Sequence, residues 1–301
     1  MSPPLSAEVD NVRILKRPNN RSLGVSTYGD PDGFPVLAFH GVPGTRLMFR
    51  PAAKIAASLG LRVIAPDRPG FGLSSPQTGR HLKDWLPELG AILDVYKIDR
   101  FALLGISGGS PFATVAAARF GRRVAALCLF GPMGPVADMA PPALSWYQRH
   151  FFLGLAKIPS AMHVLSAAAI QLFRLSPPLA YNIFLKMLPR CDRTIMRTPK
   201  LRNLVIEDVR ESIIHGGAGI CSDVRIYSQP WEIDYAKITA PTVLWQGLDD
   251  TIVPVPAAMR LGELIPRCTV ERIPGAGHFW IYDHIELVLT RLRDMAQRAP
   301  T

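Results

Sequence analysis

In the first half of the chain, short runs of apolar residues alternate with stretches in which apolar residues recur at helical spacing. The order is a run at 35–39, a helical stretch at 47–59, a run at 61–65, a helical stretch at 81–96, a run at 101–104, a helical stretch at 112–119 and a run at 124–130. Continuous apolar runs are typical of strands buried on both faces, and helical connections make such strands parallel. The pattern predicts an α/β fold with a mostly parallel central sheet and helices on both faces.

The pattern extends toward both ends of the chain. β-prone runs at 12–16 and 23–28 predict a hairpin, and later strands are expected at 242–246 and 270–273, with helices at 255–265 and 281–295. Pro87 lies inside the helical stretch 81–96, where we expect it to kink the helix.

After residue 130 the alternation stops until residue 242. Helical patterns interrupted by prolines dominate this segment, and no strong buried strand is visible in it. We therefore predict an α/β core formed by 1–134 and 239–301, with a helical cap inserted at 135–238.

The composition fits a globular protein. The 301 residues are 48% hydrophobic and 19% charged, which is sufficient for a large core and too apolar for a disordered chain. The 34 basic and 24 acidic residues give a net charge of +10. Because the basic residues are scattered and no nucleic-acid-binding motif accompanies them, we expect a basic, solvated surface, compatible with weak attraction to anionic membranes, and no nucleic-acid partner.

The cysteines and the N-terminus indicate a compartment. The four cysteines are far apart and lack metal-ligand spacing, so we expect reduced thiols, no metal site and a cytoplasmic protein. The polar N-terminal segment lacks the apolar core of a secretory signal. No apolar run reaches ~18 residues, so no integral membrane segment is expected.

A serine flanked by glycines follows the run 101–104. The motif Gly105-Ile106-Ser107-Gly108-Gly109 lies between a predicted strand and a predicted helix, as in a nucleophile elbow. Side chains at Gly105 and Gly109 would collide in so tight a turn, and the serine itself is expected to be strained. A Ser-Gly turn without chemistry is the alternative, but the flanking elements favour Ser107 as a nucleophile.

A serine nucleophile needs a base and an orienting acid. His278 follows the last predicted strand in a glycine-rich loop and is the candidate base, with a surface or helix-start histidine as the alternative. Asp250 follows the preceding strand in the spacing Gly-x-x-Asp-x-x-Val-Pro and is the candidate acid. The neighbouring Asp249 is interpreted as a turn or capping residue, and His284 lies inside a predicted helix.

The oxyanion hole requires two backbone N–H groups. Gly108, directly after the nucleophile, is expected to supply one, and Val42, in the loop after the run 35–39, the other. Losing one donor would cost ~3 kcal/mol of transition-state stabilisation. His40 precedes this loop, and we expect it to hydrogen-bond neighbouring loops rather than act as a base.

The chain order Ser107, Asp250, His278, together with the elbow and the His40-Gly41 loop, resembles the α/β-hydrolase fold superfamily. The resemblance covers 23–135 and 240–293 and implies that the insertion lies as a cap over the serine. We expect no cofactor, and the resemblance does not extend to the identity of the substrate.

The cap segment is rich in aromatic residues and methionines, most of which are expected to pack the cap itself. Those that face the serine favour a hydrophobic acyl, aryl or lactone substrate. Candidate substrate contacts are His40, Met133, Trp146 and Phe279. Cap acids at 207, 208 and 211 could hold a substrate amine, but at helical spacing they are expected to lie on the surface, and the cap arginines are expected to be a solvated helix face.

These features predict a serine hydrolase that cleaves a carboxylic ester or lactone of a hydrophobic small molecule through an acyl-enzyme. Alternatives on the same residues are carbon–carbon bond hydrolysis and proline-iminopeptidase-like chemistry. A non-catalytic ligand-binding protein of the same fold is the alternative outside enzymes. A homodimer is left open.

Overall fold

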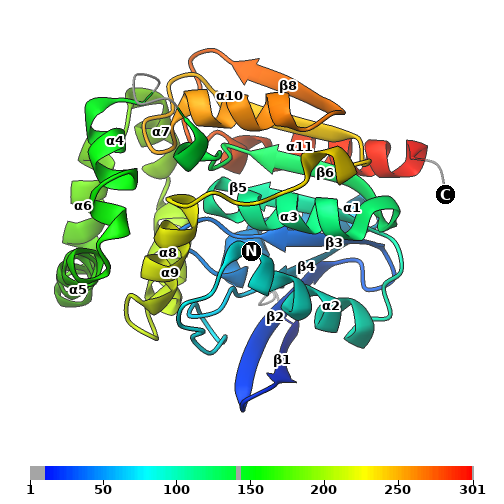
Figure 1. The fold of residues 1–301 in the computed structure, drawn as a ribbon, viewed down its shortest axis with the longest axis horizontal. Helices are drawn as coiled ribbons and strands as arrows, with labels where there is room; N and C mark the ends of the chain where they lie inside the picture. The colour runs from blue at the N-terminus through cyan, green and yellow to red at the C-terminus, as the bar shows by residue number, and fades with distance from the viewer. Residues whose placement is uncertain (1–10, 140–143, 300–301) are drawn as a thin grey trace, which may run out of the picture.

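A computed structural model describes residues 11–139 and 144–299. One eight-stranded sheet runs through the molecule in the order β1-β2-β4-β3-β5-β6-β7-β8 (Figure 1). The β1–β2 and β2–β4 pairs are antiparallel and all other neighbouring pairs are parallel. The predicted fold class is therefore confirmed. The strands are β1 (Asn11–Arg17), β2 (Arg21–Gly29), β3 (Phe34–Phe39), β4 (Leu61–Pro66), β5 (Phe101–Ile106), β6 (Val124–Phe130), β7 (Thr242–Gly247) and β8 (Cys268–Ile273).

Helices cover both faces of the sheet. The helices of the core are α1 (Ala53–Ser58), α2 (Leu86–Val95), α3 (Ser110–Phe120), α10 (Val255–Leu264) and α11 (Ile281–Arg298). Successive strand residues enter opposite cores, because side chains alternate across a sheet. Leu37 and Leu103 pack with α2, α3 and α10, whereas Val36 and Leu104 pack with α1 and α11. This double burial explains why the strands are continuous apolar runs.

The predicted hairpin is confirmed, with Asn19 and Asn20 at positive φ in its turn. Two predicted helices differ from the structure. The stretch 47–59 is divided into a 3-10 helix, η1 (Arg46–Ala52), and the short α1, because Pro51 lacks the N–H that a continuous α-helix needs. Pro87 does not kink a helix, since a 3-10 turn, η2 (Leu82–Trp85), ends before it and the proline occupies the first turn of α2.

The segment between β6 and β7, residues 131–241, is termed the helical insertion. Its α-helices are α4 (Trp146–Phe152), α5 (Pro159–Leu175), α6 (Pro177–Met187), α7 (Arg190–Met196), α8 (Pro199–Ser212) and α9 (Ala218–Tyr227). Four of the prolines in this segment lie in the first turns of α5, α6 and α8, where a missing N–H costs nothing. Figure 1 shows α4, α5 and α6 on the outer side of the insertion, with α8 and α9 nearer the sheet.

Candidate active site

Ser107 lies at a sharp turn between β5 and α3. Its φ is +52°, a left-handed conformation that is costly for a residue with a side chain. A Cβ atom at Gly105 would lie 2.8 Å from Cα of Ser110, and one at Gly109 would lie 2.1 Å from the carbonyl oxygen of Phe39. Both contacts are closer than real Cβ atoms approach, so the prediction that this turn requires glycine at 105 and 109 is confirmed.

Three polar side chains from separate strand ends form a hydrogen-bonded chain. His278 Nε2 lies 2.9 Å from Ser107 Oγ, and His278 Nδ1 lies 2.7 Å from Asp250 Oδ2. All three residues are buried, with 8%, 6% and 7% of Ser107, His278 and Asp250 exposed. A carboxylate only accepts hydrogen bonds, so Nδ1 carries the proton and Nε2 is left to accept from the serine. This is the arrangement that activates a serine hydroxyl.

Asp250, and not Asp249, is brought to the histidine. Asp250 Oδ1 accepts the backbone N–H groups of Ile252 and Val253 at 2.8 and 3.1 Å, which fixes the carboxylate while Oδ2 faces the imidazole. Asp249 is exposed and its backbone N–H donates to the carbonyl of Ala276. This geometry agrees with the interpretation of Asp249 as a turn residue.

The surroundings of His278 favour its protonated form. Burial lowers the pKa of the imidazole, but the charge and hydrogen bond of Asp250 and the charge of Asp192 outweigh burial and leave the pKa raised. A raised pKa stabilises the imidazolium that would form when Ser107 releases its proton.

The loop after β3 lies beside the serine. A Cβ atom at Gly41 would be 3.7 Å from Ser107 Oγ, and one at Gly108 would be 3.1 Å from Cγ2 of Val42. The two residues expected to supply oxyanion donors are therefore neighbours next to the hydroxyl. The donors of an oxyanion hole are expected in two such loops beside the nucleophile.

Comparisons with known proteins assign the fold to a family. The family model described as alpha/beta hydrolase fold matches residues 35–285. The chain belongs to the α/β-hydrolase fold family. The solved structures with a similar fold include an esterase from Exiguobacterium antarcticum, at 20% identity and a TM-score of 0.69 over 94% of this chain and 98% of that one. They also include epoxide hydrolase A from Mycobacterium thermoresistibile, at 18% identity and a TM-score of 0.72 over 97% and 99% of the two chains.

Curated relatives are similar at the level of sequence. A 2-hydroxy-6-oxo-2,4-heptadienoate hydrolase from Pseudomonas putida is 25% identical over 224 residues, which are 73% of this chain and 72% of the relative. A putative non-heme chloroperoxidase from Synechocystis is 24% identical over 269 residues, 88% and 92% of the two chains. Family membership and the hydrolase-named relative from Pseudomonas putida support a hydrolase.

Within this α/β-hydrolase, a carboxylate of the insertion holds the loop of the histidine, a feature that sequence reasoning missed. Asp192 of α7 is fully buried, and its two oxygens accept the backbone N–H groups of His278 and Phe279, both at 2.8 Å. The carboxylate has room because residue 277 is a glycine. A Cβ atom at that position would lie only 2.2 Å from Asp192 Oδ2. One signal was available, since Asp192 is the only acidic residue between Asp138 and Glu207.

A second link joins α9 to the loop after β3. The fully buried guanidinium of Arg68 donates to the carbonyl oxygens of His40 and Gly41 and to the carboxylate of Asp223. Tyr227, one turn further along α9, donates its hydroxyl to the carbonyl of Gly108 at 2.8 Å. Residues of the insertion therefore hold both turns that flank the serine.

His40 has the structural role that the sequence analysis expected. Its Nε2 accepts the backbone N–H of Arg68 at 3.1 Å and its Nδ1 donates to the carbonyl of Gly41 at 2.8 Å. Burial, and then the charge of Arg68, hold the pKa of His40 well below its ordinary value, so the ring stays neutral. Because the ring is fully buried with both nitrogens bonded, His40 is not placed as a substrate contact.

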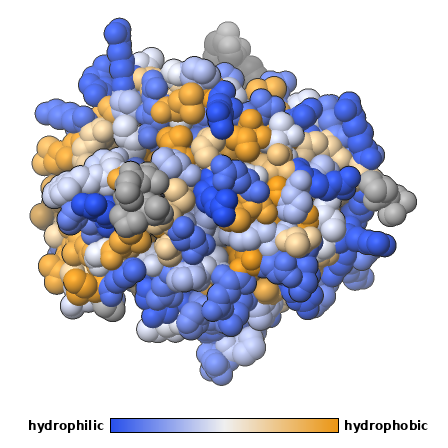
Figure 2. Space-filling view, turned by 45° about the horizontal axis from the view of Figure 1, so that its top comes forward, coloured by the Kyte–Doolittle hydropathy of each residue, from blue (hydrophilic) through white to orange (hydrophobic). Residues whose placement is uncertain are grey.

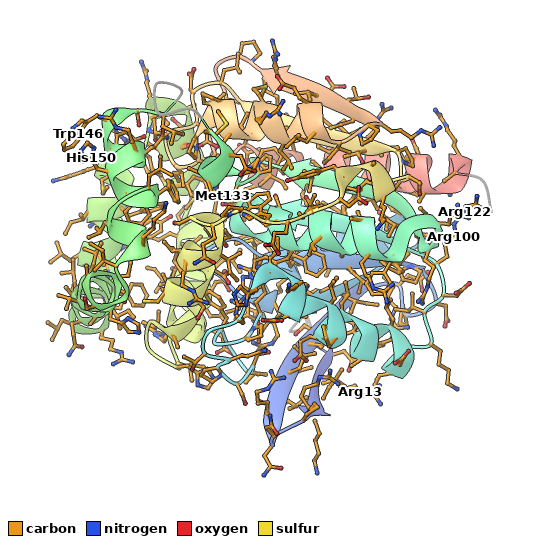
Figure 3. All side chains as sticks on the ribbon, in the orientation of Figure 1. Arg13, Arg100, Arg122, Met133, Trp146 and His150 are labelled. Atoms are coloured by element: carbon orange, nitrogen blue, oxygen red, sulfur yellow. The ribbon has the colours of Figure 1, made fainter. Side chains whose placement is uncertain are left out.

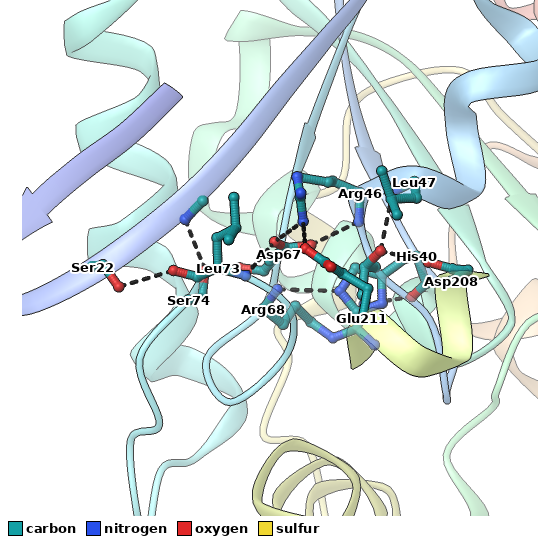
Figure 4. Close-up of polar contacts among 12 residues, drawn as sticks. Ser22, His40, Arg46, Leu47, Asp67, Arg68, Leu73, Ser74, Asp208 and Glu211 are labelled. Atoms are coloured by element: carbon teal, nitrogen blue, oxygen red, sulfur yellow. Dashed lines mark hydrogen bonds and ion pairs between the residues drawn. The ribbon is translucent and has the colours of Figure 1, made fainter. Parts of the chain in front are cut away.

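The acids of α8 are not all surface residues, which corrects the sequence expectation. Asp208 is buried and shares a hydrogen bond of 2.5 Å with Thr45 Oγ1, while Glu211 pairs with Arg46 at 2.8 Å (Figure 4). Burial raises the pKa of Asp208 to about 8. Only Glu207, which pairs with Arg50, is largely exposed. The acids tie α8 to the loop after β3, a contact that helical spacing alone does not reveal.

The remaining candidate contacts differ in position. Met133 is buried, and its backbone N–H donates to the carbonyl of Ser107 at 3.1 Å. The ring of Phe279 meets the ring of His278 edge to face, with centroids 5.3 Å apart. Trp146 is 72% exposed and packs on His150 at the outer edge of the insertion (Figure 3), so the structure does not bring it to the serine. In the described part of the chain, no three His, Cys, Asp or Glu side chains are grouped as metal ligands.

Proposed function

We propose that this protein is a serine hydrolase that cleaves a carboxylic ester or lactone of a hydrophobic small molecule. The observation that carries the proposal is the buried chain from Ser107 Oγ through the His278 imidazole to Asp250, with distances of 2.9 and 2.7 Å. A serine at the apex of a strained turn, bonded to a histidine with a fixed tautomer, supports nucleophilic attack on a carbonyl carbon.

The reaction begins when Ser107 Oγ attacks the carbonyl carbon and His278 Nε2 takes the hydroxyl proton. The carbonyl π electrons move onto oxygen, and the N–H groups of Val42 and Gly108 stabilise the negative charge. The tetrahedral intermediate collapses, the C–O bond to the alcohol breaks, and His278 returns the proton to the departing oxygen. Water then attacks the acyl-enzyme with the same base, which releases the carboxylic acid and restores the serine.

Apolar neighbours support a hydrophobic substrate. Val42 and Met133 pack with the apolar core beside the turn of Ser107, and Phe279, which contacts the His278 ring, packs against Phe184 of α6. A site bordered by such side chains gains binding free energy mainly from apolar groups of the substrate.

Carbon–carbon bond hydrolysis is the second candidate, because the Pseudomonas putida relative is named for a 2-hydroxy-6-oxo-dienoate. That substrate carries a carboxylate, which would need a cation close to the serine. Arg68 lies near but is fully buried and bonded to the carbonyls of His40 and Gly41 and to Asp223. Amine recognition by the α8 acids is disfavoured because Asp208 and Glu211 are engaged with Thr45 and Arg46.

The test is a panel of p-nitrophenyl esters of increasing acyl length, aryl lactones and a 2-hydroxy-6-oxo-dienoate, assayed with the wild type and Ser107→Ala. We expect ester or lactone turnover that the variant loses by at least ~10³-fold. Turnover of the dienoate alone would favour the second candidate. Turnover of none of these compounds, with tight binding of one of them, would favour a non-catalytic binding protein.

A further inference from the structure

Helix α5 carries two apolar stripes, and only one of them is buried. The buried stripe faces the rest of the insertion and consists of Met162, Ile170 and Phe173, with the buried Ser166 between them. On the other side of the helix, the exposed apolar residues are Val164 (71%), Leu165 (47%), Leu172 (36%) and Leu175 (85%). A surface helix normally exposes polar residues beside its one buried stripe, so this second apolar stripe calls for a partner.

The neighbouring helices extend the same exposed apolar surface. Leu179, Ile183 and Met187 form one stripe on α6, which packs against α5, and the aromatic pair Trp146 and Tyr147 lies at the start of α4. Among the described residues, ten of the sixteen exposed large hydrophobic side chains lie between Trp146 and Met187. Figure 2 shows hydrophobic residues along the left rim of the molecule, where Figure 1 places α4, α5 and α6. We term this surface the α4–α6 face.

The charges around this face have one sign. Residues 146–202 contain nine Lys or Arg residues and a single acidic residue, Asp192. Because Asp192 is buried under the His278 loop, no carboxylate of this segment reaches the surface. The exposed cations include Arg149, Lys157, Arg174, Lys186, Arg190 and Arg197.

A shallow groove at the end of α5 combines the same two properties. Its volume is about 260 Å³, and its lining residues are Phe173, Arg174, Pro177, Arg210, Ile213 and Ile214. Two guanidinium groups over an apolar floor suit a phosphate that is attached to an acyl chain.

We propose that the α4–α6 face binds the surface of a bilayer that contains anionic phospholipids. The apolar stripes would enter the boundary between headgroups and acyl chains, and the surrounding cations would pair with lipid phosphates. In the described residues no single helix is long and apolar enough to cross a membrane, although the bent pair 146–157 and 160–175 passes by length and composition. A face that lies on the bilayer accounts for apolar stripes on helices that also bury their other side.

Charge decides against a second copy of the chain as the partner. A symmetric dimer through this face would place the cations of one copy opposite the same cations of the other copy. The segment has no exposed carboxylate to pair with them. An anionic bilayer supplies both the missing negative charge and the apolar phase. The proposal does not depend on the reaction of Ser107, but it would place a hydrolase where lipophilic substrates accumulate.

The experiment is cosedimentation of the full chain, as Ser107→Ala and as wild type, with phosphatidylcholine vesicles and with vesicles containing one quarter phosphatidylglycerol. We expect both forms to bind the anionic vesicles much more tightly, with binding weakened by salt. Leu172→Ser/Leu175→Ser and Lys186→Glu/Arg190→Glu should each lower the affinity at least about tenfold. Thermal unfolding of each variant confirms that it is folded.

Matched controls change the same residue types elsewhere. Leu287→Ser replaces a half-exposed leucine of α11, and Arg122→Glu reverses a charge that Figure 3 shows at the opposite end of the molecule from Trp146. Both controls should bind like the wild type. The proposal is overturned if no form binds, if the controls weaken binding as much as the face variants do, or if the chain is a dimer that Leu172→Ser/Leu175→Ser dissociates. Loss of ester hydrolysis with vesicle binding intact would count against the proposed function alone.

Discussion

The carboxylate of Asp192 lies 2.8 Å from the backbone nitrogen of His278, so a residue of the helical insertion holds the loop of the histidine that faces Ser107. The second oxygen holds the next N–H, that of Phe279. The position of the imidazole therefore depends on how the insertion packs on the core. Substitutions in α7 should change the catalytic rate even where the substituted residue does not contact the substrate.

Asp192→Asn should lower kcat/KM by about tenfold, because one charge-assisted hydrogen bond to the loop is lost. The charge of Asp192 also helps to raise the pKa of His278, so the acidic limb of the pH profile should move to lower pH. Asp192→Ala should lower kcat/KM further, since both N–H groups lose their acceptor. Measured pH profiles that superimpose on that of the wild type would show that Asp192 only stabilises the fold.

Asp250→Asn should reduce kcat by about 10³- to 10⁴-fold, because an amide at this position no longer holds the histidine in the required tautomer. Asp249→Asn is the matched control, since this neighbouring carboxylate is exposed, and it should change kcat less than about twofold. Steady-state kinetics on one ester decide the point. A larger loss at Asp249 would contradict the geometry described above.

The rate should rise with pH through the pKa of His278. The imidazole must be neutral to accept the serine proton, and its pKa is raised above the ordinary 6.5, so the inflection should lie above that value. The stability contribution has the opposite sign. The folded state binds the proton more tightly, so this contribution is complete below the unfolded pKa and is lost as pH rises through the folded pKa. A kcat/KM profile with its inflection below 6.5 would contradict this description.

Asp208 should make the protein less stable as pH rises. Its pKa is raised from 3.8 to about 8 by burial, so the folded state retains a proton that the unfolded state has released. Between these values the free energy of unfolding falls by up to about 1.4 kcal/mol per pH unit. Asp208→Asn removes this dependence, and urea unfolding at pH 5 and pH 8 should show the variant gaining stability relative to the wild type. Glu207→Gln, on the exposed side of α8, is the control, and its free energy of unfolding should change with pH as that of the wild type does.

The side chains of the hydrogen-bonded chain could be located from the sequence because each follows a strand directly. Ser107 is marked by glycines that the turn requires, and Asp250 and His278 follow the last two strands of an alternating pattern. These are local signals, and parallel strands bring their carboxyl ends together.

The contribution of the insertion could not be predicted, since it depends on which side of each helix packs on the core. Asp192, Asp208 and Tyr227 reach the loops of the site from α7, α8 and α9, and helical spacing does not distinguish them from surface residues. Trp146 shows the converse, because an apolar residue in an apolar helix was expected near the substrate and is exposed. Of these three residues, only Asp192 is marked in the sequence, because it is a single acidic residue within a long basic segment.

The central claim is that Ser107 is a nucleophile activated by His278, and covalent labelling tests it most directly. The wild type, Ser107→Ala and His278→Ala are treated with a fluorophosphonate probe, and the adduct is located by peptide mass spectrometry. The structure predicts one adduct, on Ser107, which is absent in Ser107→Ala and forms far more slowly in His278→Ala. A wild type that stays unlabelled, or that carries the adduct on another residue, would contradict the account.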